Sequence, residues 1–129
     1  MLDTNAIIKS YLATDAALTA LVSTRIYCPR LPENATLPAI GFFTRGGTST
    51  PYIPGMPAPS VQFDCWASSP IVARQVYRAL YDALQGIQNV KVGSSYILSA
   101  REEVQGQDLQ DQDIPNYYRV LTFFEVMIR

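Results

Sequence analysis

Three residues that could carry chemistry stand side by side in this chain, at Asp64, Cys65 and Trp66. A catalytic cysteine must become a thiolate, which requires a neighbouring base or a positively charged environment. The chain has no histidine, so the commonest base for such a cysteine is missing. Cys65 alternates with Phe63 along a predicted strand, which places its side chain on an apolar face. A cysteine in that position behaves as a small hydrophobic residue, and we interpret Cys65 as part of the core.

Acidic residues provide the other chemistry that the sequence allows. Paired carboxylates can do acid–base work, and clustered ones can bind a divalent cation. The stretch 108–113 alternates acids but lacks the central glycine and closing glutamate of an EF-hand loop. We interpret it as a solvated acidic turn, while an enzyme or ligand-binding domain that uses Asp64 is the competing hypothesis. The acids considered are Asp64, Glu102, Glu103, Asp108, Asp111 and Asp113.

Metal and cofactor motifs are weak. Two cysteines without histidine cannot complete a zinc site by themselves. The glycine-rich stretch 46–50 lacks the Gly-Lys-Ser/Thr ending of a phosphate-binding loop. We therefore predict no catalytic residue, no metal site and no cofactor.

The 129-residue chain has the length of one ordinary domain, and its hydrophobic content of 48% is enough for one core. We expect a single domain over residues 1–129. The net charge is −1 and the basic residues form no run, which argues against nucleic acid as the primary partner. No apolar run approaches the roughly 20 residues of a membrane span, and the start does not resemble a signal peptide. The protein is therefore expected to be made in the cytoplasm and to avoid membranes.

Hydrophobic spacing predicts two short N-terminal helices and one main helix. Asp3 or Thr4 can cap the first helix, and the second begins near Thr14. The main helix has Pro70 at its first position and Gly86 after its end. Its apolar residues recur every four positions, at Val72, Val76, Leu80 and Leu84.

Alternating or aromatic-rich stretches predict the strands, and successive hairpins predict antiparallel pairing. The fold class is therefore α/β of the α+β kind. It has a mostly antiparallel or mixed sheet, one main helix packed on the sheet, and short N-terminal helices. Two connecting segments stand out: a long Gly/Pro-rich loop over 46–60 and an acidic polar turn over 105–116. Strands are predicted over 26–28, 39–45 and 60–67, on both sides of a turn at 93–94, and over 117–129.

Two segments look suited to protein contacts. The segment 46–60 holds three glycines and four prolines, so it cannot form a helix or an inner strand. It is either a mobile hairpin tip or a contact loop that orders on a partner. The last strand is apolar on both sides, which predicts a second layer or another subunit over it. The candidate interface residues are Thr48, Tyr52, Ile53, Met56, Leu121, Phe123 and Met127.

The order of these pieces resembles the tail terminator (tail completion) proteins of long-tailed bacteriophages. The resemblance covers nearly the whole chain, and its motifs are short packing motifs, so it transfers no specific contact residue. It implies an α/β fold and a non-enzymatic ring, usually of six copies, that caps the tail tube. The matching residues are Leu18, Leu21, Val22, Arg25, Ile26, Tyr27, Pro32, Pro38, Ile40, Trp66, Ala67, Ser68, Ala73 and Tyr118.

The partners expected from this resemblance are other copies of the chain, the tail-tube protein and the head–tail connector or neck proteins. DNA would pass through the ring without specific binding, at the head-proximal end of the tail in the virion. The acidic turn with Asp108, Asp111 and Asp113 is expected to face that channel. A neck or connector component is an alternative within the structural class. A host-encoded monomeric domain of the same fold is a further alternative.

Overall fold

The computed structural model describes residues 2–48, 56–110 and 116–129. Three helices and six strands are present in these residues, which confirms the predicted α+β class. In chain order they are α1 Thr4–Leu12, α2 Ala16–Val22, β1 Ile26–Tyr27, β2 Ala39–Thr48, β3 Ala58–Ala67, α3 Pro70–Leu84, β4 Gln88–Val92, β5 Ser95–Gln110 and β6 Tyr118–Ile128.

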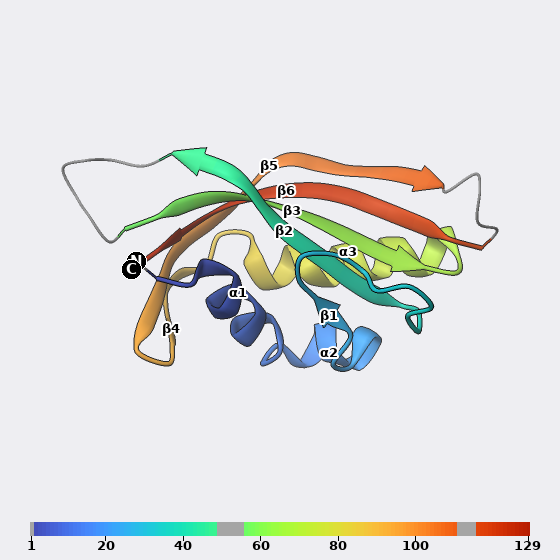
Figure 1. Ribbon diagram of the computed structural model, residues 1–129, viewed down its shortest axis with the longest axis horizontal. Helices are drawn as coiled ribbons and strands as arrows, with labels where there is room; N and C mark the ends of the chain where they lie inside the picture. The colour runs from blue at the N-terminus through green and yellow to red at the C-terminus, as the bar shows by residue number, and fades with distance from the viewer. Residues whose placement is uncertain (1, 49–55, 111–115) are drawn as a thin grey trace.

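All six strands belong to one sheet with the order β1-β2-β3-β6-β5-β4. The short β1 pairs in parallel with β2, and the other neighbours pair antiparallel. The sheet is strongly curled, and α1, α2 and α3 all lie on the same side of it (Figure 1). We call this side the helix face and the opposite side the open face. The prediction of a mixed, mainly antiparallel sheet is confirmed.

The two N-terminal helices begin at acidic caps. The Asp3 carboxylate accepts a hydrogen bond from the Ala6 N–H at 3.1 Å, and the Asp15 carboxylate accepts one from the Leu18 N–H at 2.9 Å. Each cap satisfies a backbone donor that the helix leaves free. Helices of nine and seven residues are marginal alone, so their stability depends on burying residues such as Leu12 in the core.

Helix α3 is the main helix, as predicted. Pro70 occupies its first turn, and Gly86 follows its end with a φ of 79°. Its N-cap residue is Ser69, but the Ser69 side chain makes no capping hydrogen bond. Full burial of Val76, Leu80 and Leu84 contributes about 1.5–3 kcal/mol each before chain entropy is subtracted.

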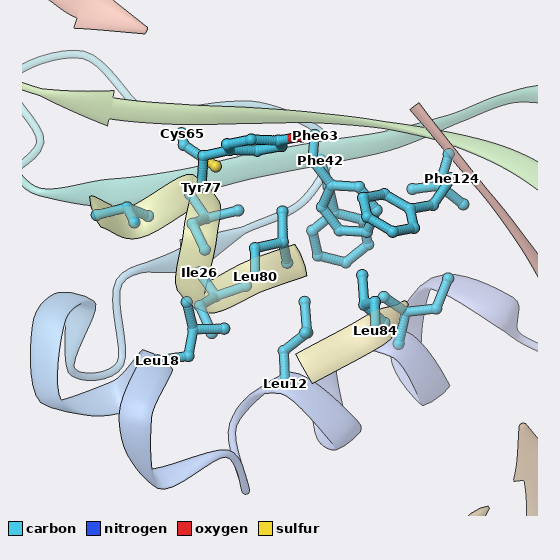
Figure 2. Close-up of a cluster of buried hydrophobic side chains, with 14 of the residues drawn as sticks. Leu12, Leu18, Ile26, Phe42, Phe63, Cys65, Tyr77, Leu80, Leu84 and Phe124 are labelled. Carbon is cyan, nitrogen blue, oxygen red and sulfur yellow. The ribbon is translucent and has the colours of Figure 1, made fainter. Parts of the chain in front are cut away.

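The core lies between the helices and the helix face of the sheet (Figure 2). Its centre is an aromatic row from three adjacent strands. Phe63 stacks on Phe42 with ring centroids 5.6 Å apart and meets Phe124 edge-on at 5.8 Å. Such pairs add to the stabilisation that comes from burial alone.

The predicted loop over 46–60 is wrong at both ends, because β2 continues through Thr48 and β3 begins at Ala58. The glycines that suggested a loop instead allow a bulge between Thr44 and Gly47. Gly47 has a φ of 137°, and a Cβ added there would lie 2.5 Å from the Ala58 carbonyl oxygen. Only glycine fits this close approach of β2 to β3.

The predicted turn over 105–116 is likewise shorter than expected, because β5 continues to Gln110. Asp108 pairs with Val120, and Gln110 pairs with Tyr118. Pairing with the apolar β6 keeps this polar sequence extended, although its own strand propensity is low. Within the described ranges, no helix is long and apolar enough to cross a membrane.

Candidate interaction surface

The Asp64–Cys65–Trp66 stretch lies on β3, where successive side chains point to opposite faces of the sheet. Cys65 is fully buried on the helix face with Phe63. Burial raises the pKa of the Cys65 thiol strongly, and the charge of Asp64 raises it further. A buried thiol held neutral is not a nucleophile. The interpretation of Cys65 as a core residue is therefore confirmed, and it is not bonded to Cys28.

Asp64 points to the open face but is only 8% exposed. One of its oxygens lies 3.4 Å from the Arg119 guanidinium, and the other accepts a hydrogen bond from Gln62 at 3.5 Å. Burial raises the pKa of Asp64, and Arg119 opposes this effect. Among the residues that the structure describes, no group of three potential metal ligands forms around it. Asp64 thus serves as a buried ion-pair partner.

The two sides of β6 are both apolar but are buried to different degrees. On one side, the helices cover four almost fully buried residues: Val120, Phe124, Val126 and Ile128. The candidate interface residues on the other side, Leu121, Phe123 and Met127, are only half-buried on the open face. None of the helices in the described ranges lies on this face (Figure 1), and long side chains of the sheet itself provide cover there.

Phe123 is covered by Arg45 of β2, whose guanidinium carbon lies 3.9 Å above the ring. The Arg45 Nε donates a hydrogen bond to the Ser60 hydroxyl at 3.1 Å. The Ser60 hydroxyl in turn donates to the Glu103 carboxylate at 2.6 Å. Three strands therefore contribute to one network that holds a cation over an aromatic ring.

A second arginine is held in the same way at the other end of the open face. Arg119 pairs with Asp64, and its guanidinium carbon lies 5.3 Å from the Trp66 ring centre. Trp66 meets Tyr117 edge-on at 6.1 Å. A third arginine, Arg101, pairs with Glu125 at 3.1 Å. The open face therefore combines aromatic residues with charges that are neutralised within the same chain.

The candidate acidic turn is only partly described. Asp108 lies on β5 and forms an ion pair with Arg74 of α3 at 3.0 Å. Its charge is thus paired, although its side chain stays 62% exposed to solvent. Asp111 and Asp113 lie outside the described residues.

The candidate interface residues of the Gly/Pro-rich segment do not all belong to one element. Thr48 ends β2, and Met56 is half-buried just before β3. Tyr52 and Ile53 lie outside the described residues. The structure therefore brings the three candidates on β6 to one face of the sheet.

Sequence reasoning missed Arg45 and Ser60, and it considered Glu103 only as a possible catalytic or metal-binding acid. These residues come from separate strands, so no short motif contains them. One signal was available: Arg45 and Phe43 share one side of a predicted strand, which places an arginine on an otherwise apolar face. An arginine in that position is suited to cover apolar surface with its long stem.

Nearly the whole chain shares its fold with a chain of a known virion structure. The known structure is described as "Virion of native gene transfer agent (GTA) particle", and the TM-score is 0.69. The alignment covers 97% of this chain and 93% of that chain, at 15% sequence identity. At this identity the likeness is one of fold. No known protein-family profile matches the sequence, and no curated protein sequence matches it.

Proposed function

We propose that this chain is a structural virion protein that caps a phage tail tube, ends tube polymerisation and forms the joint to the head. The observation that carries the proposal is the fold shared, over 97% of the chain, with a chain of a gene transfer agent virion. The packing motifs that resemble tail terminator proteins favour the same class. A protein of this class would sit at the head-proximal end of the tail as a ring, with six copies as the expected number.

The roles of the chemically capable residues favour a non-enzymatic function. Cys65 is sealed in the core, and Asp64 is held by Arg119. Both residues are therefore used for packing and pairing. A structural virion protein has no need of a nucleophile or a bound cofactor.

The open face has the composition of a protein-binding surface. Trp66, Arg119 and Phe123 belong to the residue types enriched at the centre of protein interfaces. The charges of Arg101 and Arg119 are balanced by acids of the same chain. A neutral face with aromatic anchors suits a protein partner better than it suits DNA.

The acidic segment 105–116 is proposed to face the DNA channel of the ring, where negative charge would prevent sticking. Because Asp108 is neutralised by Arg74, this proposal depends chiefly on Asp111 and Asp113. A ring structure with this segment on the outer rim would contradict it.

The direct test measures the solution mass of the chain by light scattering, alone and with purified tail-tube protein. We expect a species near six times the 14.3 kDa of one chain, and rings at tube ends in negative-stain images. Addition of the chain during tube assembly should limit tube length. A chain that stays monomeric with tubes, and leaves their length unchanged, would contradict the proposal.

A neck or head–tail connector component is the second candidate, because the fold likeness is to a whole virion and does not single out the tail. The two roles differ in their partners. Immobilised chain should retain tail-tube protein if it is a terminator, and only connector or portal protein if it is a neck component. Retention of connector protein without tube protein would favour the second role.

A further inference from the structure

Much of β5 forms an edge of the sheet on its outer side, which is the side away from β6. In the described residues, β4 pairs with this side only between Ser95 and Ser99. No other strand of the described chain lies beside residues 100–110 on that side. The N–H and C=O groups of a sheet edge can pair with a strand of another molecule, which leads to aggregation.

The first part of this edge is bonded by the residues that follow α3. The Ala100 carbonyl accepts a hydrogen bond from the Gly86 N–H at 3.0 Å. The Glu102 N–H donates one to the Gln85 side-chain oxygen at 2.7 Å. Both edge groups therefore have partners within the chain, and a strand that arrived here would have to displace them.

The next part of the edge is bonded at Gly106 by two side chains of α3. The Gly106 N–H donates to the Tyr77 hydroxyl at 3.2 Å, and the Gly106 carbonyl accepts from the Arg74 guanidinium at 3.4 Å. Arg74 also pairs with Asp108 at 3.0 Å, and its guanidinium carbon lies 5.3 Å from the centre of the Tyr77 ring. These contacts hold the two bonding side chains in place along β5.

Glycine at position 106 provides the space that the Tyr77 ring needs. A Cβ added to Gly106 would lie 2.8 Å from Cζ of Tyr77 and 2.7 Å from Cγ1 of Val120. Both separations are shorter than carbon atoms tolerate, so a larger residue would force the ring away from the edge. A glycine inside a strand often marks such a close approach.

The pairing register adds a second protection to the same edge. The register between β5 and β6 shifts between Glu102 and Val104, and again between Val104 and Gln107. Such bulges bend a strand and interrupt the regular spacing of its hydrogen-bonding groups. Bulges and covering elements are both ways in which proteins prevent pairing at an edge.

We infer that α3 and the residues after it close the outer edge of β5, over residues 100–108, to strand pairing with another copy of this chain. Tyr77 and Gln85 are the residues whose side chains occupy its N–H groups. An open edge in an assembly of many copies would favour contacts that do not close and so produce filaments. The inference does not depend on the proposed function.

The test opens the edge with the double variant Tyr77→Phe/Gln85→Ala and follows the hydrogen exchange of single amides by NMR. In dilute solution, the Glu102 and Gly106 amides lose their side-chain partners and should exchange at least about tenfold faster than in the unmodified chain. As the concentration rises, strands of other copies should cover the edge. Both amides should then become protected again while the mass measured by light scattering increases.

Two controls separate edge pairing from general effects of substitution. Tyr81→Phe/Gln75→Ala removes the same chemical groups from exposed positions of α3 and should behave like the unmodified chain. Leu12→Ala lowers stability from the buried side of α1 and leaves the edge bonds in place. It should not associate through β5 when it is compared at a temperature that gives the same unfolded fraction.

The result that overturns the inference is an opened edge that stays unpaired. In the folded double variant, this result is exchange at Glu102 and Gly106 that does not change with concentration. Equal association of Leu12→Ala would also overturn the inference, because unfolding would then be the cause. If the double variant is unfolded, Gln85→Ala alone replaces it, since Gln85 is exposed, and the Glu102 amide is the readout.

The proposed function fails or stands separately from this inference. Each variant is compared with the unmodified chain at the same concentration, so rings contribute equally to both samples. A chain that forms no ring would contradict the proposed function and leave the closed edge unaffected.

Discussion

The two sides of β6 are similar in sequence but are covered in different ways. On the helix face, Val120 and Phe124 are sealed by helices that other parts of the chain supply. On the open face, the half-buried Phe123 is covered by the long Arg45 side chain of another strand. The first cover is a packed layer, and the second is an arginine side chain that can move without unfolding the chain. This difference indicates which side stabilises the fold and which side is available to a partner.

Arginine is suited to the second kind of cover. Its apolar stem lies on the sheet while its guanidinium stays hydrated or stacks on an aromatic ring. A stack of this kind contributes on the order of 0.5–2 kcal/mol, depending on its exposure to solvent. A protein partner could therefore replace the Arg45 cover at modest cost, whereas it could not replace α3.

Two matched truncations, one on each face, test whether the two faces contribute differently to stability. Phe63→Ala removes the central ring of the buried aromatic row and should lower the free energy of unfolding by about 3–5 kcal/mol. Phe123→Ala removes a half-buried ring and the Arg45 stack, and should cost roughly 1–2 kcal/mol. Chemical denaturation of both variants measures the difference. Equal losses would show that the open face is as much a part of the core as the helix face.

The helix face was largely predictable because its signals are local. The period-two pattern at Val61, Phe63 and Cys65 and the four-residue spacing in α3 both mark the buried sides of single elements. The acidic cap of α1 and the proline of α3 mark helix starts in the same local way. These signals depend on neighbours within a few residues, so the sequence alone displays them.

The strand ends and the open face were not predictable because they depend on pairing between distant residues. Gly47 suggested a loop by composition, but its role is to let β2 approach Ala58 closely. The polar end of β5 is held extended by β6, whatever its own propensity. The Arg45–Ser60–Glu103 network joins residues separated by 15 and 43 positions, so no local pattern reveals it.

A smaller loss of stability is expected from removing the hydrogen bonds that join α3 to the sheet. The Tyr77 hydroxyl donates to the Glu102 carboxylate at 2.6 Å and accepts from the Gly106 N–H. Tyr77→Phe leaves both groups without this partner and should lower the free energy of unfolding by about 1–3 kcal/mol. The matched control, Tyr81→Phe, alters an exposed tyrosine four residues later and should change stability by less than about 0.5 kcal/mol. Similar melts for both variants would show that the hydroxyl bonds of Tyr77 contribute no net stability.

The smallest expected effect is a pH dependence of the free energy of unfolding that comes from the buried carboxylate of Asp64. Burial raises the pKa of Asp64 above its ordinary value of 3.8, in spite of Arg119. Between 3.8 and the raised pKa, the folded chain binds more protons at this site than the unfolded chain does. The contribution of Asp64 to the free energy of unfolding therefore falls as pH rises through that window, and stays lower above it.

Asp64→Asn removes this titration. Relative to the unmodified chain, the variant should gain stability as pH rises from 3 to 7, in melts at matched ionic strength. Arg119→Met should do the opposite, because it removes the cation that partly offsets burial and leaves the carboxylate charge more costly. Parallel pH profiles for the three proteins would mean that Asp64 is as well solvated when folded as when unfolded. Water would then reach the open face more than the 8% exposed fraction of Asp64 indicates. The difference in solvation between the open face and the helix face would be larger.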